Sequence, residues 1–155
     1  MKAGRKPPEP IMSTPQSRRV IQPYLFFNGR CDEALEFYRG AIGAEVLVLM
    51  RFKDSPEPPP PGMLAPGFEE RVMHAEVRVG ETTLMAADGC SAEAPGFQGF
   101  SLSLSVGSEV EAERVFAALA DGGKVRMALA KTFWSPCFGM VEDRFGLGWM
   151  VNVPA

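Results

Sequence analysis

Three polar side chains that could do chemistry alternate along one short run of the chain: His74, Glu76 and Arg78. Residues two apart on a β-strand project to the same face, so this imidazole and carboxylate would lie close enough to share a proton or a bridging water. An imidazole changes charge near neutral pH, and a guanidinium attracts anions. The run therefore predicts an acid–base or ligand-anchoring site, with His74 and Glu76 as candidate catalytic residues and Arg78 as an anion clamp.

The same run also fits an interpretation without chemistry, namely the partly solvated polar face of a β-hairpin. A two-residue turn at residues 80–81 would pair Val79 with Thr82 and Ala75 with Ala86. The polar side chains would then project from the face opposite these pairs. Cross-strand pairs on such a face contribute about 0.2–1 kcal/mol each. The sequence leaves both interpretations open.

Cysteine-based chemistry has little support in the sequence. Cys31, Cys90 and Cys137 are odd in number and show no metal-binding spacing, which favours free thiols in a reducing compartment. We therefore expect a cytoplasmic protein. Cys137 has no neighbouring histidine in the sequence that would lower its pKa. The chain also has no Gly-rich phosphate loop and no Ser-His-Asp order.

Charge and hydropathy exclude two classes of partner. The net charge is -3, yet residues 1–20 hold five basic groups and one acidic group, which leaves 11 basic and 18 acidic groups in the rest. Such an acidic body lacks the clustered Lys and Arg that neutralise phosphates. No stretch approaches the ~18–20 continuous apolar residues that span a bilayer. We therefore expect no nucleic-acid partner and no membrane partner.

The first 19 residues differ in composition from the rest of the chain. They are rich in proline and basic residues and lack the apolar stretch of about 7–15 residues found in a secretory signal. We expect a disordered leader over residues 1–19, followed by one compact domain over residues 20–155.

That domain repeats itself. Asn28-Gly29 and the helical run 33–42 return 78 positions later as Val106-Gly107 and the run 111–120. Each helical run has an apolar strand before it and a Gly-led strand after it. Repeats of this length form similar supersecondary units that bury their faces together.

The strands after each helix complete the pattern. Runs 71–79 and 82–88 follow the first helix, and runs 138–142 and 148–153 follow the second. The sequence therefore predicts an α+β fold of two βαβββ modules, about 20–90 and about 98–155. A long proline-rich loop, residues 54–69, interrupts the first.

Aromatic residues near the predicted strand ends form a second candidate set. Phe27, Trp134 and Trp149 lie where the mouth of a cleft would form. Pockets for small organic molecules are mainly apolar with a few polar anchors. These residues are therefore candidate ligand contacts, with core packing as the alternative.

Four segments resemble a known family. They are Pro23-Tyr-Leu-Phe-Phe-Asn-Gly29, Ala34-Leu-Glu-Phe-Tyr38, His74-Ala-Glu-Val-Arg-Val-Gly80 and Glu142-Asp-Arg-Phe-Gly-Leu-Gly-Trp149. Together they are similar to the PhnB-like branch of the glyoxalase/bleomycin-resistance/dioxygenase (vicinal oxygen chelate) superfamily. This resemblance implies a cupped mixed β-sheet with helices outside, commonly within a homodimer. It implies no single activity, because one fold hosts many chemistries.

The resemblance also implies where a metal would bind. Metal-using relatives place four ligands on the first and last strand of each module, which here correspond to positions near Pro23, Met85, Ser101 and Met150. None of these is a usual ligand for a divalent ion, which takes imidazole, carboxylate or thiolate. We therefore expect neither a metal nor another cofactor.

These observations predict a small-molecule-binding protein with a metal-free cleft between the modules, acting as a sequestering protein or as an acid–base enzyme. Two alternatives stay open: a metal-dependent lyase, isomerase or dioxygenase that uses His74 and Glu76 among non-standard ligands, and an inert dimeric scaffold. The sequence does not say whether the cleft lies within one chain or across a homodimer. The candidate ligand-binding residues are Phe27, Arg78, Met85, Ser101, Ser103, Trp134, Trp149 and Met150.

Overall fold

The computed structural model describes residues 19–90 and 96–155. Almost all of the predicted leader therefore lies outside the described residues. No helix in these two ranges is long and apolar enough to cross a bilayer.

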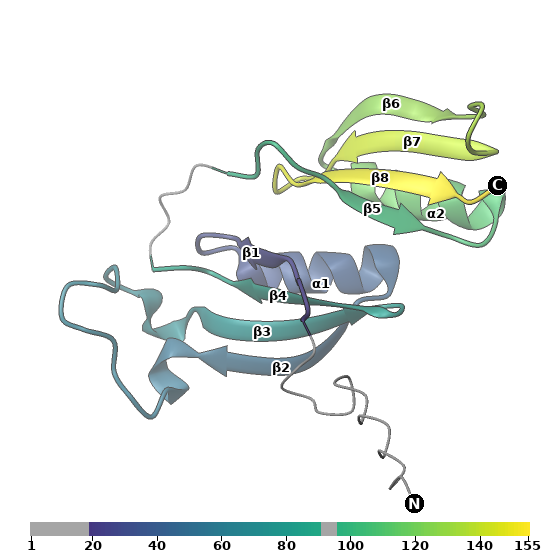
Figure 1. The fold of residues 1–155 in the computed structure, drawn as a ribbon. Helices are drawn as coiled ribbons and strands as arrows, with labels where there is room; N and C mark the ends of the chain where they lie inside the picture. The colour runs from purple at the N-terminus through teal and green to yellow at the C-terminus, as the bar shows by residue number, and fades with distance from the viewer. Residues whose placement is uncertain (1–18, 91–95) are drawn as a thin grey trace, which may run out of the picture.

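The first module is a βαβββ unit (Figure 1). Its strands pair in the order β1-β4-β3-β2, with β1 parallel to β4 and the other pairs antiparallel. The elements are β1 (Tyr24–Phe26), α1 (Cys31–Ile42), β2 (Glu45–Arg51), β3 (Val72–Val79) and β4 (Thr82–Ala87). Two short 3-10 helices, Phe52–Asp54 and Phe68–Glu70, begin and end the proline-rich loop.

The second module repeats this arrangement, with the strand order β5-β8-β7-β6 and one parallel pair, β5 with β8. Its elements are β5 (Leu102–Ser105), α2 (Glu109–Ala120), β6 (Lys124–Ala130), β7 (Cys137–Glu142) and β8 (Gly148–Val153). The predicted α+β fold of two βαβββ units is confirmed.

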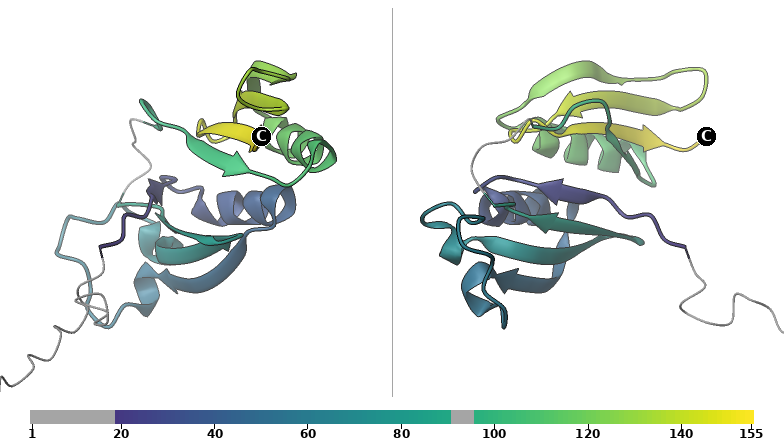
Figure 2. Two further views of the ribbon diagram at one scale, coloured as in Figure 1. Left: turned by 45° about the vertical axis from the view of Figure 1, so that its right-hand side comes forward. Right: turned by 60° about the vertical axis from the view of Figure 1, so that its left-hand side comes forward.

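The two sheets are separate within one chain. The helices α1 and α2 contact each other and lie between the sheets, so each sheet turns one face outward (Figures 1 and 2). The chain alone therefore does not form the single cupped sheet that the resemblance implies, because each module turns its helix, and not its free sheet face, toward the other.

Buried side chains of both modules form one continuous hydrophobic cluster. In the first module, α1 packs Ala34, Leu35 and Tyr38 toward the sheet and toward α2. In the second, α2 begins at the predicted capping box, where the Ser108 hydroxyl accepts a hydrogen bond from the Glu111 amide at 3.1 Å.

A turn of the second module docks into the first. Asp143 is only 2% exposed, and its carboxylate accepts hydrogen bonds from the Tyr38 hydroxyl at 2.5 Å and the Trp149 indole at 2.9 Å. The backbone amides of Phe145 and Leu147 also donate to it. Four donors thus satisfy a buried carboxylate, and one of them comes from the other module.

Two cation–π contacts support the same junction. The Arg144 guanidinium lies 4.3 Å from the centroid of the Phe37 ring, and that of Arg30 lies 4.5 Å from the centroid of Phe145. Such contacts contribute about 0.5–1 kcal/mol at exposed positions. The turn at residues 143–146 therefore holds the two modules in their relative orientation.

Asp88 is a second buried carboxylate, to which the sequence analysis assigned no role beyond the end of the predicted run 82–88. Its oxygens accept hydrogen bonds from the backbone amides of Cys31 at 2.7 Å, Val72 at 2.8 Å and Gly29 at 2.9 Å. Because Cys31 begins α1 and Val72 begins β3, one side chain fixes the start of both elements. Negative charge is also favourable at a helix N-terminus.

We expect Tyr38→Phe to lower the free energy of unfolding by about 1.5–3 kcal/mol, because it removes a buried hydrogen bond to a charged group. Urea unfolding of the variant measures the change. The matched control is Tyr24→Phe, because the other tyrosine lies on an outward face, and this change should lower the free energy of unfolding far less. Equal free energies for wild type and Tyr38→Phe would contradict the assigned role.

The contact between Tyr38 and Asp143 predicts that the free energy of unfolding depends on pH. Burial, together with the neighbouring Asp143 carboxylate, raises the pKa of Tyr38 above its ordinary value of 10.0. Above about pH 10 the unfolded chain loses this proton while the folded chain keeps it, so the free energy of unfolding falls as the pH rises. Urea unfolding between pH 8.5 and 11 should show a shallower fall for Tyr38→Phe than for wild type; parallel curves would contradict the prediction.

Candidate functional site

The outward face of the first sheet carries the predicted acid–base residues. The pairing of β3 with β4 sets Val79 opposite Thr82 and Ala75 opposite Ala86, which is the register predicted from the turn. His74, Glu76 and Arg78 therefore project away from α1. We call this surface the His74 face, and it comprises Tyr24, Phe26, Val48, Met50, His74, Glu76, Arg78 and Met85.

Two side chains contact the imidazole of His74. The Tyr24 hydroxyl lies 2.9 Å from Nδ1, and the Glu76 Oε1 lies 3.7 Å from Nε2. The result is a line of phenol, imidazole and carboxylate, with the imidazole in the middle: Tyr24 comes from β1, and His74 and Glu76 both come from β3, with β4 between the two strands. The phenol and the imidazole share a hydrogen bond, whereas the carboxylate lies beyond hydrogen-bond distance and can exchange a proton with the imidazole through one bridging water.

Tyr24 is the residue that the sequence analysis missed. It is paired with Met85 in the parallel register of β1 with β4. Tyr24 and Phe26 alternate with the buried Leu25, and this alternation indicates that the two rings project from the same face of β1. Burial raises the pKa of Tyr24, so its hydroxyl keeps its proton at neutral pH.

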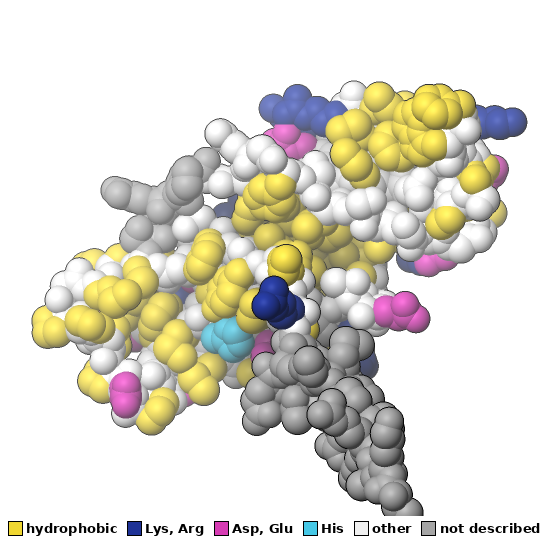
Figure 3. All heavy atoms as spheres, in the orientation of Figure 1, with side chains coloured by type: hydrophobic (Ala, Val, Ile, Leu, Met, Phe, Trp, Pro, Cys, Tyr) yellow, Lys and Arg dark blue, Asp and Glu magenta, His cyan; other side chains and the backbone are white. Residues whose placement is uncertain are grey.

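The surroundings of this line are mainly apolar. The rings of Tyr24 and Phe26 stack with their centroids 5.0 Å apart and their planes inclined by 20°. They are 38% and 50% exposed, so both remain accessible. Figure 3 shows the single histidine, in cyan, beside hydrophobic side chains on the surface of the first module.

Arg78 has a partner of its own on the His74 face. Its guanidinium lies 2.6 Å from a carboxylate oxygen of Glu45, which is opposite it on β2. Glu45 therefore neutralises the guanidinium, and an anion would have to displace that carboxylate to use the predicted clamp.

The outward face of the second sheet carries other predicted contacts. Met150 is paired with Ser103 on one side and Met140 on the other. Trp134 lies beside this surface, with its ring 5.4 Å from that of Phe138. We call this surface the Met150 face, and it comprises Ser103, Trp134, Phe138, Met140, Met150 and Asn152.

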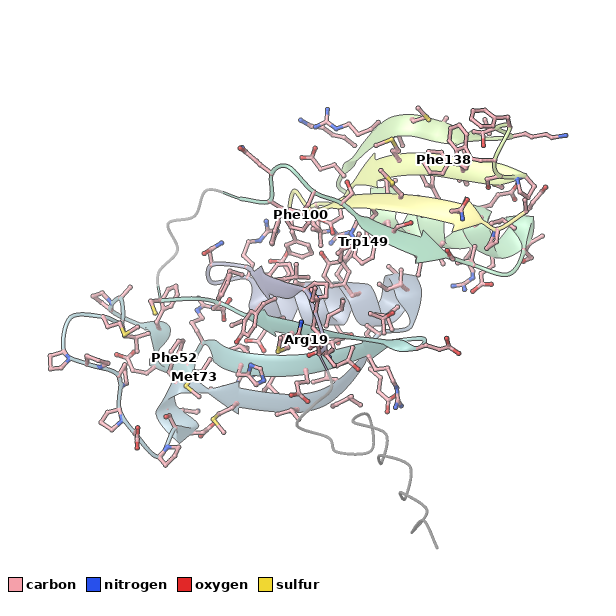
Figure 4. The ribbon with its side chains drawn as sticks, viewed as in Figure 1. Arg19, Phe52, Met73, Phe100, Phe138 and Trp149 are labelled. Atoms are coloured by element: carbon pink, nitrogen blue, oxygen red, sulfur yellow. The ribbon has the colours of Figure 1, made fainter. Side chains whose placement is uncertain are left out.

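Phe27 and Trp149 are buried, which fits the core-packing alternative given for them. Phe27 packs against Tyr38 and Phe145, and Trp149 donates its indole hydrogen bond to Asp143. Alternation along β8 turns Trp149 toward α1 and Met150 outward. Figure 4 shows Trp149 at the junction of the modules and Phe138 farther from the first module.

The predicted metal positions change slightly with the observed register. The side chains beside Met85 and Met150 are those of Tyr24 and Ser103, whereas Pro23 and Ser101 lie just before their strands. One phenol, one hydroxyl and two thioethers do not make a donor set for a divalent ion. In the described ranges no three His, Cys, Asp or Glu side chains come together as a metal-binding group. These residues do not fit the metal centre of the fold family.

Hollows lie in the space between the modules. One, of about 520 Å³, is lined by residues that include Val79, Ser105 and Arg114, and another, of about 240 Å³, by residues that include Leu84 and Leu102. Ser103 lines both, whereas His74 and Glu76 line neither. Figure 3 shows hydrophobic side chains gathered between the two modules.

The cysteines are poor nucleophiles. Cys31 and Cys137 are buried, and burial raises the pKa of both thiols above the ordinary value. Nearby carboxylates raise both further: those of Asp88 and Asp32 act on Cys31, and those of Glu109 and Glu113 on Cys137. A thiolate is the reactive form, so neither residue suits covalent catalysis.

Comparison with known proteins places the chain in a family. A model of the family described as 3-demethylubiquinone-9 3-methyltransferase matches residues 19–152. Protein YjdN of Escherichia coli is 37% identical over 140 residues, which cover 86% of this chain and 94% of that protein.

Solved structures agree with this placement. Protein PA1353 of Pseudomonas aeruginosa is 45% identical, with a TM-score of 0.77 over 88% of this chain and 98% of that one. A putative 3-demethylubiquinone-9 3-methyltransferase, PhnB protein, of Bacillus cereus is 27% identical, with a TM-score of 0.69 over 87% and 99%. A glyoxylase/bleomycin resistance protein/dioxygenase domain of Frankia sp. shares the fold, at 13% identity and a TM-score of 0.64 over 89% and 98%. The chain therefore belongs to the family described as 3-demethylubiquinone-9 3-methyltransferase, whose solved structures include a PhnB protein.

Proposed function

We propose that this PhnB-like protein binds a small organic ligand on the His74 face, without a metal, at a site that a second copy of the chain completes. The observation that carries the proposal is the line of Tyr24, His74 and Glu76 within an apolar surface. A few polar anchors in a mainly apolar surround are typical of small-molecule sites. His74 and Glu76 supply the acid–base pair of this face.

The orientation of the modules supports a site shared between two chains. The His74 face and the Met150 face of one chain both turn outward, on opposite sides of the helix layer (Figure 2). Both carry exposed apolar side chains, such as Phe26 on one and Trp134 on the other. Such exposed apolar surfaces mark interaction sites. A homodimer in which the Met150 face of one copy lies over the His74 face of the other would cover both and enclose a cleft.

A thermal-shift screen tests ligand binding. The panel holds hydrophobic amines, thioethers and quinones, since the name of the family refers to a demethylated ubiquinone. At a ligand concentration of 100 Kd, binding stabilises the folded state by about 2.7 kcal/mol. For a chain of this size that corresponds to roughly 5–10 °C in Tm.

We expect His74→Ala and Glu76→Gln to reduce this shift strongly, because both remove an anchor from the line. Glu113→Gln, which changes an exposed carboxylate on α2, is the matched control and should keep the full shift. A panel without any binder, or a shift that His74→Ala leaves unchanged, would refute the proposed site.

Mixing two defective variants tests the shared site. His74→Ala damages one face, and Ser103→Trp blocks the other at an exposed position. In a symmetric dimer with random subunit exchange, about a quarter of the sites combine two intact faces, so the mixture should regain about a quarter of the binding capacity. Binding is measured by isothermal titration after exchange. A monomer in sedimentation, or a mixture as inactive as its components, would contradict the dimer.

A further inference from the structure

We infer that Tyr24 determines which ligands the site accepts, and that these are planar aromatic molecules carrying a hydrogen-bond acceptor oxygen. The inference rests on the proposed function, because it places the ligand on the His74 face. It adds a residue that the sequence analysis did not single out and a chemical class for the ligand.

The hydrogen bond between Tyr24 and His74 determines whether the Tyr24 hydroxyl can donate to a ligand. Their polar atoms are 2.9 Å apart, so one of them donates and the other accepts. In a neutral imidazole only one ring nitrogen carries a proton, whereas an imidazolium donates from both. When Nδ1 accepts, the Tyr24 hydroxyl donates its hydrogen bond to His74. When Nδ1 donates, the Tyr24 hydroxyl is free to donate a hydrogen bond to a ligand.

The second step concerns the groups around the imidazole. His74 is paired with Met50 of β2, and Met85 of β4 is paired with the neighbouring Glu76; neither methionine titrates. Glu76 on β3 provides the carboxylate within 4 Å of its Nε2, and Tyr24 on β1 provides the phenol. The charged pair of Arg78 and Glu45 lies farther along the face. The imidazole of His74 therefore lies between a carboxylate on one side and the phenol of Tyr24 on the other.

The third step concerns the shape of the surface. Tyr24 and Phe26 form a stacked pair whose outer surfaces are accessible, and Met85, which is paired with Tyr24, adjoins it. Rings prefer offset stacking on such a pair, and thioethers pack well against ring edges. A flat ring placed here would bring its substituent oxygen to the Tyr24 hydroxyl. An aliphatic ligand would gain neither the stacking nor this alignment.

A matched pair of probes separates the two contributions. 2-Acetylnaphthalene carries a carbonyl oxygen, and 2-ethylnaphthalene has a similar shape without it. Tyr24→Phe keeps the ring and removes only the hydroxyl. We expect this variant to bind 2-acetylnaphthalene roughly 3–10-fold more weakly than wild type, the size of one neutral hydrogen bond, and to bind 2-ethylnaphthalene equally well. The affinities of wild type and Tyr24→Phe for both probes are measured by isothermal titration.

The outcomes distinguish this inference from the proposed function. If wild type binds other ligand classes in a His74-dependent manner but neither naphthalene, the inference is wrong and the proposed function stands. Equal effects of Tyr24→Phe on both probes would also overturn it. If the naphthalenes bind and His74→Ala changes nothing, the proposed site itself is wrong.

Discussion

The buried hydrogen bond between Tyr38 and Asp143 is the interaction on which the rest of this structure depends. It joins α1 of the first module to the β7–β8 turn of the second, and it lies in a place from which water is largely excluded. A carboxylate buried there requires every one of its donors, because an unsatisfied buried charge costs several kcal/mol. This requirement fixes α1 against the β7–β8 turn. Because α1 and α2 lie between the sheets, one face of each sheet is open to solvent.

The arrangement separates structural and chemical roles cleanly. The inner faces of the sheets carry the alternating apolar residues that pack on the helices, such as Val77 and Val151. The residues next to them in each strand project from the outer faces, where polar side chains are tolerated. The two buried carboxylates, Asp88 and Asp143, serve architecture alone, since backbone amides and buried side chains occupy their oxygens. The proposed ligand site lies instead on the His74 face.

Local patterns predicted much of this molecule. The repeat gave both modules, and the turn at Gly80-Glu81 gave the hairpin register and therefore the face of His74. Tyr24 was not predicted as a site residue because its partner strand β4 lies about 60 residues away in the sequence. Parallel strands are not joined by a tight turn from which the register could be predicted. Trp149 was assigned to a ligand site because nothing local says which side of β8 meets a helix. Asp88 and Asp143 look like ordinary loop carboxylates until the amides of distant segments are brought to them.

One measurement tests the central claim, that a ligand binds beside His74, most directly. The chain contains a single histidine, so an isotope-labelled sample gives one imidazole signal set in a nuclear magnetic resonance spectrum. A ligand that raises the Tm should shift that signal in a saturable manner, with the same Kd as the thermal or calorimetric titration. A ligand that binds with full affinity while the imidazole signal stays unchanged would contradict the account.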